Sequence, residues 1–125
     1  MKIFNGGMVN TDANGFAVPA ADTASHKCIG RANSTADTTA SGPFGVLGDG
    51  DARVLFEADV GIYEYNNPAG ANQLTQVDVG KLGYVLTDNE VCRAAGTVNS
   101  IIAGRVVKVD VTNNRATIDH RQHAV

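Results

Sequence analysis

Turn-forming residues divide this sequence into short apolar segments, and this division constrains the fold more than any other feature. The 125 residues include 14 Gly, and Asn, Asp, Ser and Thr recur between short runs of Val, Ile, Leu and Ala. Gly, Asn and Asp favour turns because they tolerate positive φ or bond to nearby backbone groups, whereas Val-rich segments favour strands. No segment carries an apolar stripe at helical spacing. The sequence therefore predicts a mainly β fold, a small antiparallel β-barrel or sandwich built from hairpins, with long surface loops and little helix.

Length and composition allow a single core made mostly of aliphatic side chains. A chain of this length fits one domain, and 43% of its residues are hydrophobic while only 6% are aromatic, with no Trp. The net charge of -3 gives no long-range attraction to phosphate backbones or anionic membranes, so we expect neither nucleic acid nor a membrane as partner. The first 15 residues lack the hydrophobic stretch of a signal peptide, and no apolar run is long enough to cross a bilayer.

Three hairpins and one further strand are predicted from local turn chemistry. Asn14 and Gly15 lie between apolar pairs, which is a strong hairpin signal, and Pro19 ends that strand or marks a sheet edge. The segment TDNE at 87–90 stands between KLGYVLT and EVCRA, where a hairpin needs a turn. The segment TNN at 112–114 turns a last hairpin, with Ile102, Val107, Val109 and Val111 on one side of its first strand. HKCIGRA at 26–32 is expected to be a strand.

Two longer segments are predicted as surface loops, at 33–50 and 66–80. The first is too rich in Ser, Thr, Gly and Asp to form an amphipathic helix. Residues 52–65 between the loops form two strands or one bent strand. Around them, we expect a flexible N-terminal arm at 1–7, a single β domain at 8–120 and a C-terminal tail at 121–125.

The acidic residues of TDNE are the first candidates for catalysis. Asp88 and Glu90 could act as a general acid and base, but nothing near them in sequence would orient a substrate. Asp and Asn are common in turns for structural reasons, and Glu90 would begin the return strand and face water. We therefore predict no catalytic residue, and the chain is not expected to be an enzyme.

The two cysteines and their nearest histidine are the next candidates. Cys28 and Cys92 have no CxxC spacing, which favours two reduced thiols on strands in a protein made in a cytoplasm. His26 lies two residues from Cys28, on the same side of the expected strand. A nucleophile would need a third group and an oxyanion hole that the sequence does not supply, so a buried thiol beside a half-exposed histidine is the preferred interpretation.

No metal or cofactor is predicted. The segments DANG, beginning at Asp12, and DGD at 49–51 resemble pieces of calcium loops but lack the other ligands of an EF-hand. His120 and His123 are three residues apart, yet a strand precedes them and no third ligand is near, so we expect a solvated tail. Tyr63 and Tyr65 alternate with Glu64, which disfavours a face that stacks nucleic-acid bases.

Three sequence blocks follow one another between Gly15 and Asp110: GFAVPAADTASHKCIGRA, GDGDARVLFEADVGIYEYNN and LTQVDVGKLGYVLTDNEVCRAAGTVNSIIAGRVVKVD. In this order they resemble a family of structural proteins of tailed bacteriophages that decorate the capsid. The most specific parts are AVPAADT with GRA, the VDVGKLGYVLTDNEV block, and AGRVVKVD. The chain departs from the family in its short N-terminal segment and in lacking a final strand with Trp. These departures bear on capsid attachment.

The resemblance implies a cement protein that stabilises the expanded capsid from its outer surface after synthesis in the host cytoplasm. Its partners would be the major capsid protein and two further copies of itself in a homotrimer. We expect Lys2, Ile3 and Phe4 to contact the capsid or a neighbouring subunit, by docking or by strand addition, although a frayed terminus is the alternative. A receptor- or carbohydrate-binding module displayed on the virion is the alternative function.

Overall fold

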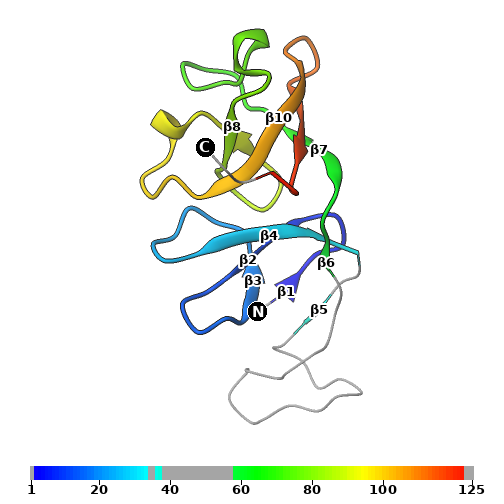
Figure 1. Ribbon diagram of the computed structural model, residues 1–125, viewed down its shortest axis with the longest axis vertical. Helices are drawn as coiled ribbons and strands as arrows, with labels where there is room; N and C mark the ends of the chain where they lie inside the picture. The colour runs from blue at the N-terminus through cyan, green and yellow to red at the C-terminus, as the bar shows by residue number, and fades with distance from the viewer. Residues whose placement is uncertain (1, 34–35, 38–57, 123–125) are drawn as a thin grey trace.

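The computed structural model of the chain describes residues 2–33, 36–37 and 58–122, and its described residues form β-strands joined by turns (Figure 1). One sheet has four strands in the order β3-β2-β4-β6, a second has five in the order β7-β11-β10-β8-β9, and β1 pairs with β5 alone. All pairs between neighbouring strands are antiparallel. The described residues include two 3₁₀ turns and no α-helix. The predicted mainly β fold with little helix is confirmed.

Most of these elements lie in predicted strands, but β1 lies in the predicted N-terminal arm and β5 in the first predicted loop. The short pair and the four-stranded sheet comprise β1 (Lys2–Ile3), β5 (Ala36–Asp37), β2 (Met8–Thr11), β3 (Ala17–Pro19), β4 (Lys27–Ala32) and β6 (Ala58–Asp59). The five-stranded sheet comprises β7 (Ile62–Asn66), β8 (Leu82–Val85), β9 (Val91–Cys92), β10 (Ile102–Asp110) and β11 (Arg115–Asp119). The 3₁₀ turns are η1 (Gln76–Asp78) and η2 (Ala94–Gly96).

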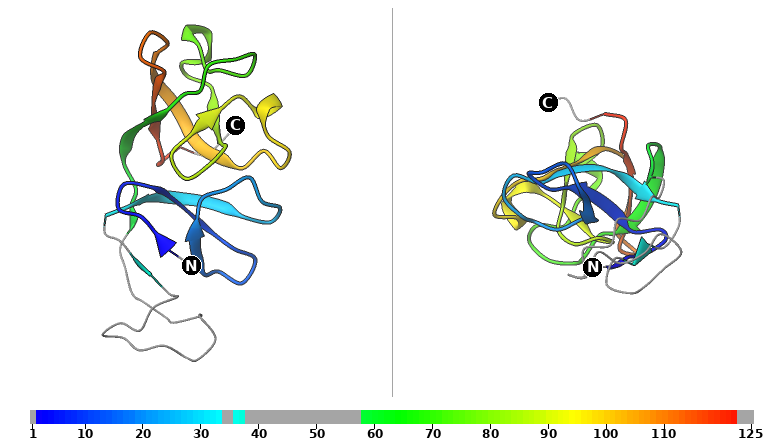
Figure 2. Two further views of the ribbon diagram at one scale, coloured as in Figure 1. Left: turned by 180° about the vertical axis from the view of Figure 1, so that it is seen from behind. Right: turned by 90° about the horizontal axis from the view of Figure 1, so that it is seen from below.

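The two larger sheets form two layers, with β4 lying below β10 and the chain passing from one layer to the other between β6 and β7 (Figures 1 and 2). The sheets do not close into a barrel, so the sandwich is the correct one of the two predicted architectures. The main core lies between the layers and includes Met8 and Cys28 from the first sheet and Val85, Val106 and Ile118 from the second. A smaller cluster joins Ile3, Val9 and Ala32.

The first hairpin forms as the Asn-Gly pair predicts. Strands β2 and β3 pair across a turn in which the carboxylate of Asp12 accepts hydrogen bonds from the backbone amides of Asn14 and Phe16, at 2.9 and 3.0 Å. Pro19 is the last residue of β3, an edge strand of its sheet, as expected for a residue without an amide hydrogen.

The last hairpin also forms, but the residues of its first strand that face the core differ in part from those predicted. Val107 has no partner on β11, because the pairing shifts between Val106 and Lys108 and leaves a bulge. A bulge changes which face later side chains occupy. Ala103 and Val106 are fully buried, whereas Val107 is 38% exposed. The predicted inward side of this strand was therefore wrong at Val107, and Val111 is exposed as well.

Three other predicted segments have mixed outcomes. Within 52–65 the described residues form two strands, β6 and β7, and not one bent strand. Residues 38–50 of the first predicted loop and 52–57 lie outside the described residues. The second predicted loop contains η1. At the C-terminus, Arg121 and Gln122 both donate hydrogen bonds to the carboxylate of Asp119, so the beginning of the predicted tail is attached to the domain.

Candidate functional site

A buried polar pair, Tyr65 and His120, lies between the two sheets. Tyr65 lies on β7 and is 3% exposed, and His120 follows β11 and is 2% exposed. The Tyr65 hydroxyl lies 2.5 Å from His120 Nε2, and His120 Nδ1 lies 2.8 Å from the carbonyl oxygen of Ala103. Because a carbonyl oxygen can only accept, Nδ1 carries the proton and Nε2 accepts from the hydroxyl. Both ring nitrogens are thereby satisfied.

Cys28 on β4 brings the first sheet into this group. Its sulfur lies 4.0 Å from His120 Nδ1. Burial raises the pKa of the thiol to about 12. Burial, and to a lesser extent Cys28, also raise the pKa of Tyr65. A reactive cysteine requires a lowered pKa and access to solvent, so this thiol is kept protonated and chemically inert. The Cys28–Tyr65–His120 group joins the two layers and offers no nucleophile.

The expected buried thiol and half-exposed His26 are confirmed. The imidazole beside Cys28 is that of His120, whose predicted place in a solvated tail was wrong. A signal for the correct placement was present, since Ala116, Ile118 and His120 alternate with other residues and such alternation puts all three on one face of a strand. His123, the other half of the predicted pair, lies outside the described residues.

The TDNE segment turns the predicted hairpin and also connects the two sheets. Strands β8 and β9 pair on either side of it. The backbone carbonyl of Asp88 accepts from the amide of Met8 at 2.6 Å, and that of Asn89 accepts from the amide of Asn66 at 2.9 Å. Glu90 is half-buried and accepts a hydrogen bond from the Thr87 hydroxyl, so the expectation that it faces water was wrong. Asp88 and Asn89 thus serve the architecture through their backbone carbonyls, and Glu90 through its side chain.

The remaining candidate residues that the structure describes, Asp12 and Cys92, also have structural roles. Asp12 caps its own turn, as described above, and residues 49–51 lie outside the described residues. Cys92 is buried on β9 and unpaired, like Cys28, which places both thiols on strands as predicted. Within the described part of the chain, no three His, Cys, Asp or Glu side chains lie close enough to hold a metal ion.

The predicted contact residues at the N-terminus are partly built into the domain. Lys2 and Ile3 form β1, which pairs with Asp37 and Ala36 of β5. Ile3 is 4% exposed and packs in the cluster with Val9 and Ala32, whereas Phe4 is 53% exposed. The expectation of a flexible arm was therefore wrong for Ile3, whose side chain packs in an apolar cluster of the domain. Among the described side chains of this segment, that of Phe4 leaves a large apolar surface exposed.

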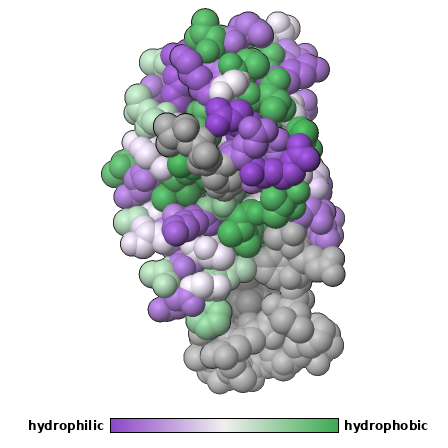
Figure 3. All heavy atoms as spheres, viewed as in Figure 1, coloured by the Kyte–Doolittle hydropathy of each residue, from purple (hydrophilic) through white to green (hydrophobic). Residues whose placement is uncertain are grey.

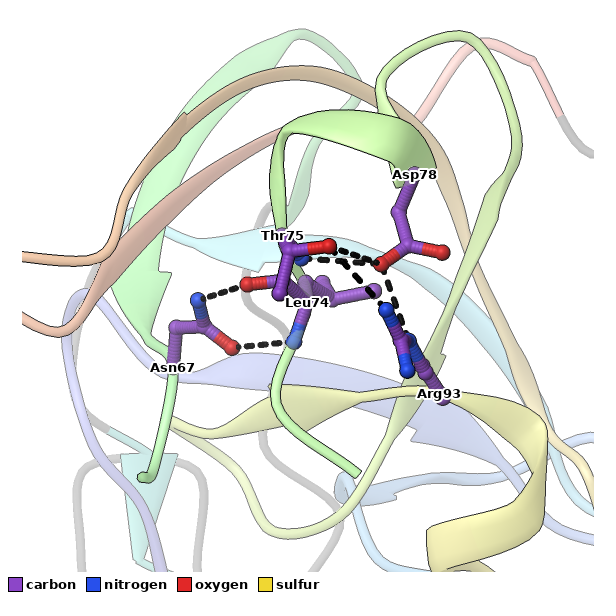
Figure 4. Close-up of polar contacts among 5 residues, drawn as sticks. All are labelled: Asn67, Leu74, Thr75, Asp78 and Arg93. Atoms are coloured by element: carbon purple, nitrogen blue, oxygen red, sulfur yellow. Dashed lines mark hydrogen bonds and ion pairs between the residues drawn. The ribbon is translucent and has the colours of Figure 1, made fainter. Parts of the chain in front are cut away.

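A second polar network lies where the loop after β7 meets the segment after β9 (Figure 4). The Asn67 side chain donates to the carbonyl of Leu74 and accepts from its amide, which fixes the loop. One carboxylate oxygen of Asp78 accepts from the Thr75 amide at 2.8 Å and from Arg93 Nε at 2.9 Å. Burial alone would raise the pKa of Asp78, but the bonds from Thr75 and Arg93 outweigh it and lower that pKa. This ion pair fixes the Arg93 guanidinium at the surface.

Comparisons with protein families, with curated proteins and with solved structures find no match for this chain. Among the described residues, no helix has the length and apolar character needed to cross a membrane. What is established is the class of fold, a mainly β sandwich of two antiparallel sheets. The resemblance to capsid decoration proteins stays a prediction.

Proposed function

We propose that this protein is a structural component of a tailed-bacteriophage virion that decorates the outside of the expanded capsid and stabilises it. The observation that carries the proposal is the position of Phe4, a large apolar side chain that is 53% exposed directly after β1. Aromatic residues held in place at a surface are the usual anchors of protein interfaces. The major capsid protein is the proposed partner.

The way β1 is held supports this use of Phe4. Ile3 is buried against Val9 and Ala32, and the next residues are fixed by hydrogen bonds, including the one from the amide of Gly7 to the carbonyl of Phe4 at 3.0 Å. A ring on a fixed segment loses little conformational freedom when it binds, which favours affinity. Phe4 is thus the anchor, and Lys2 and Ile3 are the residues that position it.

The sequence blocks that resemble decoration proteins also support a scaffold role. They contribute β3 and β4, then β6 and β7, then η1 through β10, so they span both layers and the turn that joins them. Assembly as a homotrimer is part of the proposal. Three copies of a modest contact, joined in one trimer, would bind a capsid far more strongly than one copy, because the second and third contacts form at high effective concentration.

Co-sedimentation with heads of the same virus that lack this protein tests the proposal. We expect saturable binding to expanded heads, weaker binding to unexpanded heads, and greater heat resistance of the decorated shells. Phe4→Ser should weaken binding about 10- to 100-fold, the effect of removing one buried aromatic anchor. Phe16→Ser is the matched control, because Phe16 is 52% exposed at the β2–β3 turn.

Two results would count against the proposal in different ways. Absence of binding to either form of the head would remove capsid decoration as the function. Binding that Phe4→Ser and Phe16→Ser weaken equally would retain decoration but remove Phe4 as the specific anchor. Circular dichroism of both variants establishes that each is folded.

A further inference from the structure

A hollow of about 510 Å³ opens on the surface between β8, β10 and the two 3₁₀ turns. Its rim carries Lys81, Arg93 and Arg105 together with one acid, Asp78. Three cations and one carboxylate give a local charge of +2, whereas the whole chain carries -3. The Asp78 carboxylate is paired with Arg93 and also attracts Lys81 without an ion-pair contact, which leaves the net charge of the rim positive. The hollow is a positive surface on an acidic protein.

Two of the cations are held rigidly around this hollow. Arg93 donates from Nε to Asp78 at 2.9 Å and from Nη2 to the Thr75 hydroxyl at 3.0 Å. These bonds leave the Nη1 side of the guanidinium for a contact with a ligand. Arg105 donates to the carbonyl of Gly80 and to the side chain of Gln122. Such preorganised guanidinium groups lose little freedom on binding an anion.

The third cation is Lys81. It is exposed, and within the described part of the chain its ammonium group has no hydrogen-bond acceptor or ion-pair partner. The lining of the hollow also includes the partly buried side chains of Leu82 and Tyr84 and two alanines, so it offers apolar surface as well as charge. A ligand that fits would combine negative groups with small apolar ones.

We propose that this hollow binds an acidic segment of a partner protein, through carboxylates that pair with Lys81 and with the exposed edge of Arg93. Arginine binds a carboxylate with matching planar geometry. A protein segment is favoured over nucleic acid, because the net charge of -3 opposes a polyphosphate, with a charge on every nucleotide, more than a segment with a few carboxylates. It is also favoured over a small phosphate, because the donors are separate side chains and the lining amides of Gly80 and Lys81 already donate to the carbonyls of Val106 and Asp78. The inference goes beyond the proposed function. It is tested on the purified chain with a peptide, and it does not depend on a role in the virion.

The test is a titration of the ¹⁵N-labelled full chain with a short peptide of alternating Ala, Glu and Asp, at about 50 mM salt, where surface electrostatics is weakly screened. A peptide with Gln and Asn at the acidic positions is the matched ligand control. We expect saturable shifts of the amides of Lys81, Leu82 and Tyr84 with the acidic peptide only. Lys81→Glu should weaken binding about 5- to 10-fold, the scale of one or two surface ion pairs.

Lys27→Glu is the matched protein control, because Lys27 is exposed on β4 in the other sheet and the substitution changes the net charge equally. We expect Lys27→Glu to change the affinity less than twofold. Three results would overturn the proposal: no saturable shift at these amides, equal weakening by Lys27→Glu, or displacement of the peptide by inorganic phosphate at an equal concentration of anionic groups. Retained dispersion of the amide signals shows that each variant is folded.

Discussion

Replacing Tyr65 by Phe removes one hydroxyl group from between the two sheets and leaves the ring in place. The partner of that hydroxyl is His120 Nε2 at 2.5 Å, on a side chain that is only 2% exposed. His120 cannot compensate by moving its proton, because Nδ1 donates to the carbonyl of Ala103 and would then face that oxygen with a lone pair. The substitution therefore removes the hydroxyl donor from a buried acceptor.

The expected loss of stability follows from the lost hydrogen bond to His120 Nε2. Leaving a buried polar group without its partner costs about 1–3 kcal/mol, so we expect Tyr65→Phe to lower the free energy of unfolding by about 2 kcal/mol. For a domain of this length this corresponds to a decrease in Tm of roughly 6–10 °C. The loss of packing volume is small because the ring remains.

Urea denaturation followed by circular dichroism measures this difference, with Tyr63→Phe as the control. Tyr63 lies two residues earlier on β7, is partly exposed, and makes no hydrogen bond through its hydroxyl in the described structure, so its substitution should cost less than about 0.5 kcal/mol. The m-value should stay unchanged in both variants. If Tyr65→Phe were no more destabilising than Tyr63→Phe, the assignment of the buried Tyr–His bond would be refuted.

Three further predictions concern the backbone, a carboxylate and a thiol. Gly104→Ala should destabilise by about 3 kcal/mol or more, because φ is +154° and an added Cβ would lie 2.3 Å from the carbonyl oxygen of Asp119, whereas Gly70→Ala, with open space around it, should cost about 1 kcal/mol in the same urea assay. Asp22→Asn should cost about 1 kcal/mol at pH 7 and flatten the loss of stability below pH 4, because bonds from the Val98 and Asn99 amides lower the pKa of Asp22. Cys28→Ala should flatten the loss of stability between pH 9 and 12, because burial raises the pKa of this thiol to about 12.

The signs of the two pH effects are opposite, and urea titrations across pH measure both. A carboxyl whose pKa is lower in the folded chain stabilises it above the unfolded pKa, and this contribution disappears as the pH falls. A thiol whose pKa is higher in the folded chain stabilises it below the unfolded pKa, and this contribution disappears as the pH rises through the folded value. A variant whose pH profile parallels that of the wild type would contradict the role given to Asp22 or Cys28. For the glycine pair, equal destabilisation would contradict the close approach at Gly104.

The sequence predicts the hairpins well because their signals are local. Asn14 and Gly15, the TDNE segment and the TNN segment each carry the turn chemistry that their own backbone requires, and the strands beside them follow. The choice between barrel and sandwich was not predictable, because it depends on which edge strands meet across the whole molecule. The bulge at Val107 was not predictable for the same reason, since it depends on the pairing partner and not on local composition.

The polar groups between the sheets were the least predictable part. His120 and Cys28 are 92 residues apart, and only the packing of one layer on the other brings them together. The partial burial of the N-terminal residues is likewise a tertiary effect, because Ile3 finds its apolar neighbours on β2 and β4. Alternation along β11 was the one sequence signal that could have placed His120 in the interior.

The double attachment of the TDNE turn has a consequence for how the chain unfolds. Met8 belongs to one layer and Asn66 to the other, and both donate to carbonyls of adjacent residues in this one turn. The turn itself belongs to the five-stranded sheet, so the bond from Asn66 lies within that layer and the bond from Met8 crosses to the other layer. Separating the layers therefore breaks the Met8 bond, and opening the β8–β9 turn removes a bond from each sheet, which couples the unfolding of the two layers.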